Sequence, residues 1–375
     1  MTDVSPSTTR RRLSFRRLSV VGFRNLIDGV YEPGPDLNVI TGDNGQGKTS
    51  LLEALYFAAT TRSFRTEKLP ALVQHDRSEL AVAASIEEAG RPREQRAQIV
   101  RGIRRVAIDG KRPPRLLDYA QKTPVVVFHP GDLELVAGAS SQRRRLLDRV
   151  ALFVDPHGYA SRAAYERALK ERQKALEERG EHALDLDPFE ALCAEHGARF
   201  QRSRELAAEA LARHVGSGFE RLAPALLSLA LRHVPGGSSD PARFLSELRE
   251  RRRKDIVRRA PSFGPQRDEL EIELDGKGAR FHASQGQQRI VTLALKLAEL
   301  ECILEARGAE PVLLLDDVSS ELDPSRTGAV YDVVRSAVSQ VFVTTTRPDL
   351  FPTTIAAARS RSDWTVSAGR LTRIR

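Results

Sequence analysis

The sequence feature that most constrains the fold is a glycine-rich segment, GDNGQGKTS, at residues 42–50. A short apolar run, residues 37–41, precedes it, and a stretch with helical spacing follows it to about Thr60. The spacing G-x-x-x-x-G-K-T is that of a loop that wraps phosphate groups. Because a strand, such a loop and a helix form one unit of a parallel sheet, the segment predicts an α/β fold.

The residue types in this segment suit a bound nucleotide. Glycines let backbone N–H groups turn towards the phosphates, Lys48 supplies positive charge to the β- and γ-phosphates, and the Thr49 hydroxyl can ligate Mg²⁺. The N-terminus of the following helix adds partial positive charge. We therefore predict that the loop binds ATP and Mg²⁺ rather than matching the pattern by chance. The expected nucleotide contacts are Gly42, Asn44, Gly45, Gly47, Lys48, Thr49 and Ser50.

A second motif, PVLLLDD at residues 311–317, carries two carboxylates. Its apolar residues predict a buried parallel strand, which delivers the side chains after it to the sheet edge where α/β folds bind ligands. We expect Asp316 to hold Mg²⁺ through water and Asp317 to orient or deprotonate an attacking water. Lys48 and Asp317 are therefore the predicted catalytic residues. The alternative is an ordinary strand with an acidic end.

A third segment, SQGQQ, begins at Ser284 and precedes an amphipathic helix from about Gln287 to Ala306. A serine and a glycine before a helix can be a plain N-cap. This polar stretch is longer than a cap needs, and it lies shortly before the acidic strand. We therefore single out Ser284 and Gly286 as candidate site residues.

The composition favours a protein that binds polyanions. The chain of 375 residues contains 59 lysines and arginines against 50 acidic residues, a balance that suits nucleic acid or an anionic membrane surface. Three basic clusters, residues 10–12, 141–145 and 249–254, are candidate phosphate contacts, although each can equally be a solvated face. Aromatic residues make up 6% of the chain, which favours recognition of a duplex backbone over base stacking.

Cysteine use and hydropathy argue against several classes of protein. Cys193 and Cys302 have no metal-ligand spacing and are expected to be buried and reduced. The N-terminal segment lacks the apolar core of a signal peptide, and no uncharged apolar run reaches the roughly 18 residues of a membrane span. We therefore expect a soluble intracellular protein without a membrane partner.

The pattern along the chain indicates a core interrupted by two lobes. Proline and glycine breaks in the helical stretch prevent the sustained heptads of a long coiled coil. The expected parts are a flexible tail at 1–12, the first part of the core at 13–130 with a β insertion at about 64–122, a helical lobe at 131–262, and the rest of the core at 263–375.

Taken together, the three motifs resemble those of the ABC-type ATPases of chromosome maintenance and repair. More narrowly, most of the chain resembles the RecF family of bacterial recombination mediators. Two positions depart from that family, because Gln266 stands where histidine is usual and Gln173 stands where asparagine is usual. Thr345 occupies the position at which transporter ATPases place a switch histidine. The matching segments are LSVVGFRNL, TRSFRTEK, LELVAGASSQRRRLLDR, YERALKERQKAL, GPQRDELEI, ASQGQQRIVTLALKLAEL and LLLDDVSSELD.

The resemblance implies a P-loop ABC-type ATPase core with a β-rich insertion, a mainly helical second lobe and no long coiled coil. It implies an ATP-driven homodimer in which Ser284, Gly286 and Gln287 of one copy reach the nucleotide of the other, with Asp323 and Thr345 as further contacts. The implied activity is weak, DNA-dependent ATP hydrolysis that times the binding of duplex DNA near single-strand gaps.

The implied partners are DNA and a RecR-type mediator, which helps to load recombinase in a cytoplasmic, nucleoid-associated setting. Two other classes stay open from the residues alone. The first is the nucleotide-binding subunit of an ABC membrane transporter, and the second is a chromosome-bridging ATPase, which needs longer coiled coils than this chain can form.

Overall fold

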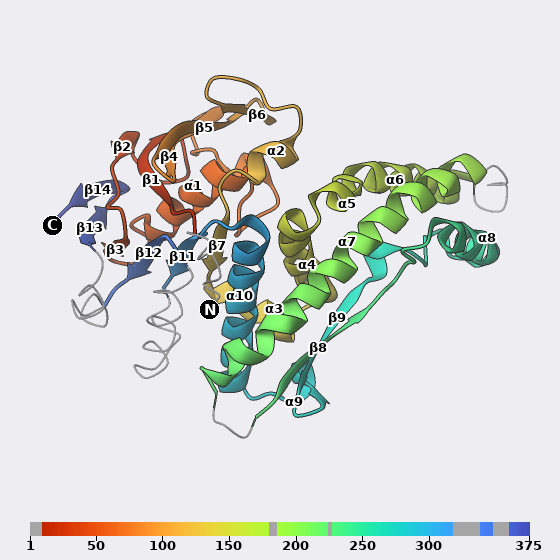
Figure 1. Ribbon diagram of the computed structural model, residues 1–375. Helices are drawn as coiled ribbons and strands as arrows, with labels where there is room; N and C mark the ends of the chain where they lie inside the picture. The colour runs from red at the N-terminus through yellow and green to blue at the C-terminus, as the bar shows by residue number, and fades with distance from the viewer. Residues whose placement is uncertain (1–9, 180–185, 224–226, 318–337, 348–359) are drawn as a thin grey trace, which may run out of the picture. The chain divides into compact units, whose positions relative to one another are not determined.

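The computed structural model divides into two compact units (Figure 1). The first unit combines Met1–Asp132 with Ile303–Arg375, and the second unit is Leu133–Cys302. The residues that the structure describes are 10–179, 186–223, 227–317, 338–347 and 360–375.

The first unit is built on a six-stranded sheet with the order β14-β13-β3-β12-β11-β7. All neighbouring pairs run parallel except β13 and β14. Strands β7, β11 and β12 are buried along their whole length, which explains the apolar runs VVVF, VLLL and VFV within them. The strands are β3 (Leu37–Thr41), β7 (Val125–Phe128), β11 (Val312–Asp316), β12 (Gln340–Thr345), β13 (Arg361–Ser367) and β14 (Arg370–Arg373).

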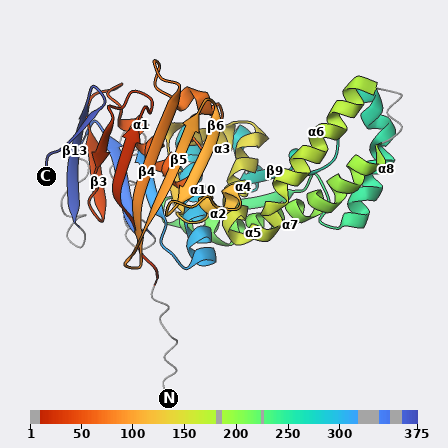
Figure 2. The ribbon, with the colours of Figure 1, turned by 90° about the horizontal axis from the view of Figure 1, so that it is seen from above.

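An antiparallel sheet with the order β2-β1-β4-β5-β6 forms a second layer of this unit. Helix α1 (Lys48–Thr60) contacts β4 and β5 of this sheet and β7, β11 and β12 of the parallel sheet, so it lies between the two layers (Figure 2). The β insertion expected at about 64–122 contains β4 to β6 and the short helix α2 (Leu116–Ala120). The strands are β1 (Leu13–Val21), β2 (Gly29–Tyr31), β4 (Glu79–Glu88), β5 (Arg91–Val100) and β6 (Ile103–Ile108).

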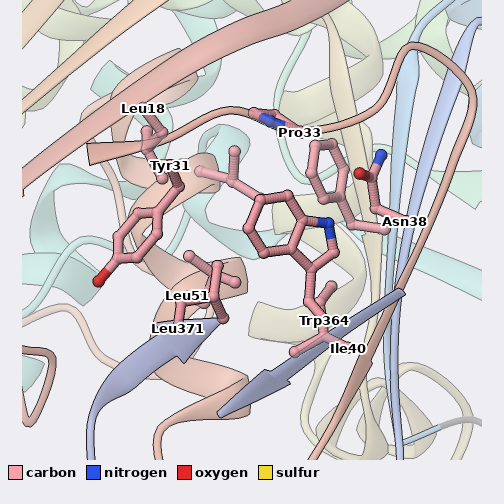
Figure 3. Close-up of a pocket in the computed structure, with 10 residues that line it drawn as sticks. Leu18, Tyr31, Pro33, Asn38, Ile40, Leu51, Trp364 and Leu371 are labelled. Carbon is pink, nitrogen blue, oxygen red and sulfur yellow. The ribbon is translucent and has the colours of Figure 1, made fainter. Parts of the chain in front are cut away.

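A small apolar cavity of about 20 Å³ remains in the core of the first unit. Figure 3 shows the indole ring of Trp364 among Leu18, Tyr31 and Leu51 in the wall of this cavity. The space is sufficient for about one water molecule. Trp364 is the single tryptophan of the chain and is 7% exposed, so its fluorescence reports the packing of the first unit.

The second unit is mainly helical and carries a three-stranded sheet with the order β10-β9-β8. Helix α7 is 34 residues long and packs on α4, α5, α6 and α8, so the described residues form a compact lobe without a long coiled coil (Figure 1). The helices are α3 (Glu134–Ala137), α4 (Ser140–Val154), α5 (Pro156–Ala160), α6 (Arg162–Arg179), α7 (Asp187–Glu220), α8 (Pro241–Arg258), α9 (Ala279–His282) and α10 (Gln285–Arg307), and the strands are β8 (Leu229–Val234), β9 (Glu269–Leu274) and β10 (Lys277–Gly278).

Residues 263–302 belong to the second unit. The sequence pattern instead predicts that they form part of the core, together with the residues that follow them to 375. The physical reason is pairing with partners that precede them in the chain. Strand β9 pairs along its length with β8, and Gly218 of α7 lies against Ala294 and Leu297 of α10. Helix α10 reaches the first unit with its last residues, from Ile303.

A buried ion network joins α6, α7 and α8. The Arg172 guanidinium lies 3.0 Å from a carboxylate oxygen of Glu190 and 2.7 Å from one of Asp255, and all three side chains are fully buried. Arg252 provides a second cation to Glu190, at 2.5 Å. Buried charges are tolerated when they are paired in this way, and removing one partner leaves an uncompensated charge in a medium of low dielectric.

We predict that Arg172→Leu destabilises the second unit by about 3–5 kcal/mol, because two buried carboxylates lose their shared cation. Urea unfolding followed by far-ultraviolet circular dichroism should show the loss in the helical signal, while the fluorescence of Trp364 should report a smaller change in the first unit. The matched control is Arg167→Leu on the same helix, where the side chain is exposed. Equal effects of the two substitutions would contradict the assigned role.

Candidate nucleotide-binding site

The loop between β3 and α1 has a backbone shape that requires glycine. Gly42, Gly45 and Gly47 have φ angles of +146°, +80° and +117°, a region that other residues rarely adopt. A Cβ atom on Gly42 would also lie 2.4 Å from the carbonyl oxygen of Val366. The spacing of glycines in the sequence therefore reflects conformational need at each of the three positions.

Lys48 places its ammonium group against this loop. Its Nζ atom donates to the carbonyl oxygens of Gly42, at 2.6 Å, and Asp43, at 3.0 Å. The lysine is 7% exposed, so the positive charge is held at the loop by a side chain that packs inside the protein. A cation together with the first turn of α1 suits an anionic phosphate group.

Asp316 connects three elements at the C-terminal edge of the parallel sheet. Its Oδ1 atom accepts hydrogen bonds from Thr49 of α1, at 2.9 Å, and from Thr344 of β12, at 2.8 Å. The Thr344 hydroxyl also accepts from the backbone N–H of Asp317, at 2.9 Å. The structure therefore brings the predicted Mg²⁺ ligands Thr49 and Asp316 together, and it places Asp317 directly beside them.

The electrostatics of Asp316 reflect its burial. The side chain is about 5% exposed, and burial raises its pKa above the usual range for an aspartate. Hydrogen bonds from Thr344 and Thr49 and the nearby His129 oppose this rise, while Asp317 adds to it. A positive ion at this edge would relieve the cost of the buried negative charge.

The residues present fit a Mg²⁺ ion that is shared with a nucleotide. Thr49 and Asp316 offer hard oxygen ligands within 2.9 Å of each other, and Mg²⁺ bound to nucleotides keeps several water and phosphate ligands beside one or two protein oxygens. Within the described ranges there is no group of three or more histidine, cysteine or acidic side chains that could hold a metal alone. The donor set thus suits Mg²⁺ together with phosphates.

Other predicted contacts of the loop lie in different surroundings. Asn44 is exposed, whereas Ser50 is buried and its hydroxyl donates to Oδ1 of Asn25, at 2.7 Å. Thr345 is fully buried at the end of β12, in register with Thr41, the residue before the loop. Its roles as a nucleotide contact and as the residue in the switch position remain predictions.

Ser284, Gly286 and Gln287 belong to the second unit, at the start of α10. The Gln287 side chain accepts from the Ser284 N–H at 2.8 Å, and the Ser284 hydroxyl accepts from the Gln287 N–H at 3.3 Å. This reciprocal arrangement is a capping box. Ser284 and Gly286 are exposed, so the capped helix terminus is accessible to solvent. Asp323 lies outside the described residues.

The orientation of α10 is fixed by a buried ion cluster. Glu299 accepts from Arg149 of α4, at 2.5 Å, and from Lys296, at 2.6 Å. Burial alone would raise the pKa of Glu299, but the two cations outweigh it and lower that pKa to about 2. The carboxylate therefore stays ionised throughout the physiological range, and it links α4 to α10.

The basic clusters found in the sequence are engaged to different degrees. Arg143 is 5% exposed and pairs with Glu269 at 2.6 Å, and Arg144 donates to the carbonyl oxygen of Asp268. In the tail cluster, Arg12 pairs with Asp36 at 2.6 Å. On α8, the exposed cations without an ion-pair partner among the described residues are Arg243, Arg253, Lys254 and Arg258.

The two family departures have structural partners. Gln266 accepts a hydrogen bond from the Tyr165 hydroxyl and donates to the carbonyl oxygen of Phe263, at 2.8 Å. Gln173 donates to the carbonyl oxygen of Arg259, at 3.0 Å. Both side chains therefore stabilise the second unit.

Three residues near the loop were missed by sequence reasoning. Thr344 bridges the two aspartates, Asn25 contacts Gly45 in the loop and Ser50 in α1, and His129 follows β7 beside Asp316. Thr344 had a signal, because it follows the apolar residues of a buried strand, as Asp316 does. Asn25 and His129 had no such sequence signal, since the residues that they contact are distant from them in the sequence.

The sequence and the fold match a known family of ATPases. A family model described as the RecF/RecN/SMC N-terminal domain matches residues 14–361. A solved Smc head domain from Pyrococcus furiosus is 17% identical over 96% of both chains, with a TM-score of 0.55, and it supports the fold alone. In the described part of the chain, no helix combines the length and apolar character of a membrane span. The fold and the loop therefore define a phosphate-loop ATPase of the ABC type.

Individual relatives show to which family of ABC-type ATPases the chain belongs. The DNA replication and repair protein RecF of Anaeromyxobacter sp. (strain Fw109-5) is 40% identical, over 88% of this chain and 91% of the relative, and that of Myxococcus xanthus (strain DK1622) is 38% identical, over 88% and 90%. A solved structure of the recombination mediator protein RecF with ATP in the RecFOR pathway has a TM-score of 0.87 and 25% identity, over 99% of this chain and 100% of the other. The chain belongs to the RecF family.

We predict that Asp316→Asn raises or preserves the melting temperature at pH 7 while it lowers Mg²⁺-dependent ATP hydrolysis by at least about 100-fold. Because the folded-state pKa of Asp316 is raised, its ionisation costs stability once the pH exceeds that pKa, and asparagine removes this cost while still accepting from Thr49 and Thr344. Thermal unfolding in EDTA and a phosphate-release assay measure the two effects.

Asp36→Asn is the matched control with the opposite sign. Although burial raises the pKa of Asp36, hydrogen bonds from Arg12 and Ser360 hold it below its usual range. Its charge therefore adds stability above the unfolded-state pKa, and this stability is lost as the pH falls through the folded-state pKa. At pH 7 the substitution should lower the melting temperature. A fall of similar size for Asp316→Asn would contradict the prediction.

Proposed function

We propose that the protein is an ATP-dependent DNA-binding protein of recombinational repair and replication maintenance, with ATP hydrolysis as a slow timer. The observation that carries the proposal is the contact of Thr49 with Asp316, which joins the phosphate loop to the acidic strand end. Membership of a family whose relatives include a RecF structure with ATP supports the choice of nucleotide. The Mg²⁺ ion would polarise the phosphates, Lys48 would bind them, and Asp317 would orient the attacking water.

We infer that the active form is an ATP-driven homodimer with two composite sites. The exposed N-terminus of α10, with Ser284 and Gly286, would bind the γ-phosphate that a second copy holds on its loop. The helix terminus offers partial positive charge to this anion. Because ADP lacks the γ-phosphate, ATP and ADP would differ in affinity for the two states, and such a difference is what shifts a monomer–dimer equilibrium.

Ser284→Arg tests the composite site. We expect the variant to bind ATP as a monomer with wild-type affinity but to remain monomeric in sedimentation velocity with ATP, because the large side chain blocks the approach of the second copy. Ser284→Thr is the control, since threonine retains the capping oxygen and should still dimerise. A Ser284→Arg protein that dimerises normally would exclude this interface.

The DNA part of the proposal is supported by the outer face of the antiparallel sheet. Burial alternates along β4, so one face of the sheet is turned to solvent. The register sets Arg17 of β1 beside Ser85, and it sets Arg105 of β6 in one row with Gln98 and Ala81. The small residues Ala81, Ala83 and Ser85 of β4 lie on this face and would leave room for a phosphodiester backbone between the cations.

The charge on this face is available for binding. Arg17 and Arg105 are exposed and have no ion-pair partner within the described chain. Three further cations flank β6 and are likewise exposed without an ion-pair partner among the described residues, namely Arg101, Lys111 and Arg112. Contacts of this kind give affinity without base specificity and release counterions, so DNA binding should weaken steeply with salt.

We predict that Arg17→Glu combined with Arg105→Glu lowers affinity for duplex DNA in ATP by about tenfold or more and reduces the salt slope by about two, because two phosphate contacts are lost. Fluorescence anisotropy with ATP, ADP or no nucleotide, at several salt concentrations, provides the measurement. The net-charge control is Arg253→Glu combined with Lys254→Glu on α8. This double variant should lose less affinity for duplex DNA.

Equal losses in the two double variants would argue against the sheet face. Wild-type binding that ignores the nucleotide would refute ATP gating, and the absence of any affinity for DNA would refute the DNA part of the proposal. The remaining parts of the proposal are a RecR-type mediator as partner, assistance in recombinase loading near single-strand gaps, and a cytoplasmic, nucleoid-associated location. Resemblance to the RecF family supports these parts.

A further inference from the structure

We propose that Asn25 is a positioning residue that, together with the turn at Ala368 and Gly369, holds the phosphate loop in its nucleotide-binding shape. The inference rests on the nucleotide binding proposed above. It concerns two segments that are separated by more than 300 positions in the sequence and that contact the loop directly.

The Asn25 side chain contacts the turn of the loop and the first turn of the helix that follows it. Its Nδ2 atom donates to the carbonyl oxygen of Gly45, at 3.0 Å. Its Oδ1 atom accepts from the hydroxyl of Ser50, at 2.7 Å, in the first turn of α1. One amide group thus fixes the distance between the turn of the loop and the helix that follows it.

The second contact comes from the turn between β13 and β14. The backbone N–H of Gly369 donates to the carbonyl oxygen of Gln46, at 2.9 Å, and the backbone N–H of Ala368 donates to the Gln46 side chain, at 2.6 Å. Gln46 therefore has both its main chain and its side chain tied to the C-terminal hairpin.

The two contacting segments are also bound to each other. Gly369 accepts a hydrogen bond from the N–H of Ile27, at 2.9 Å. A Cβ atom on Gly369 would lie 2.0 Å from the carbonyl oxygen of Asn25, and its φ angle is +76°. Glycine is needed at this position because the two segments approach so closely. The loop is consequently held by one connected support.

This support has a physical purpose. A loop with three glycines of positive φ has many alternative conformations, and ordering it on ligand binding would cost conformational entropy. A carbonyl oxygen of Gly45 that is engaged by Asn25 cannot turn towards an anionic phosphate, where it would repel the ligand. Pre-organisation of this kind improves affinity without adding a contact to the ligand.

A purely structural role is the competing explanation, and the chain offers a matched control for it. Asn38 is fully buried in the same unit, donates to the carbonyl oxygen of Gly34 at 2.9 Å, and accepts from its N–H at 2.7 Å. It makes the same kind of two-bond contact to a different loop. Loss of Asn38 should therefore cost stability without affecting the phosphate loop.

The experiment compares Asn25→Ala, Asn25→Asp and Asn38→Ala with the wild-type full-length protein. Three quantities are measured: the dissociation constant of a fluorescent ATP analogue with Mg²⁺, the melting temperature, and hydrogen exchange of residues 43–48 without nucleotide. We expect at least a tenfold rise in the dissociation constant and faster exchange of the loop in both Asn25 variants. For Asn38→Ala we expect a lower melting temperature with affinity within about twofold of wild type.

Each outcome bears on the proposal. If the wild type fails to bind the analogue, the proposed nucleotide function fails, and this result is separate from the role of Asn25. If the wild type binds and Asn25→Ala binds equally well with unchanged loop exchange, the positioning role is wrong. If Asn25→Asp weakens binding of the analogue and Asn25→Ala does not, charge repulsion explains the loss of affinity. This result would also overturn the positioning role. If Asn25→Ala does not fold, Asn25→Asp decides through loop exchange, because aspartate keeps the acceptor for Ser50.

Discussion

The Asp316 carboxylate, which accepts from Thr49 and Thr344, is the interaction on which the rest of the site depends. It fastens the helix after the phosphate loop to two neighbouring strands of the parallel sheet. The same carboxylate is nearly buried, so the protein maintains a negative charge where it is costly. A stability cost of this kind at one point is typical of binding sites, which are organised for a ligand rather than for the empty protein.

Local patterns predicted the elements around the loop with good precision. The expected strand at residues 37–41 and the expected helix from Lys48 to Thr60 coincide with β3 and α1. Their signals are local, because a buried parallel strand must be apolar and a phosphate loop needs glycine at set positions. The pairing of Thr49 with Asp316 also followed from a general rule, since parallel strands deliver their ends to one edge.

The parts that sequence reasoning missed depend on distant contacts. Nothing near Asn25 in the chain indicates that it meets Gly45 or that Gly369 lies against it. Residues 263–302 join the helical unit because of β8 and α7, which no local pattern encodes. The arginines show the same limit. A run of basic letters gives no hint that Arg143 is buried against Glu269, or that Arg105 lies in one exposed row with Gln98.

The position of β3 has a consequence for how the chain is made. Both neighbours of this central strand, β12 and β13, are synthesised about 300 residues or more after it. At about 5–20 residues per second, the ribosome needs roughly 15–60 s to deliver them. During that interval the second unit, whose residues are continuous from Leu133 to Cys302, can fold on the ribosome, while β3 and its loop await their partners. The apolar strand is exposed to chaperones and to aggregation throughout this period, so truncation before β13 should leave an insoluble fragment instead of a weak enzyme.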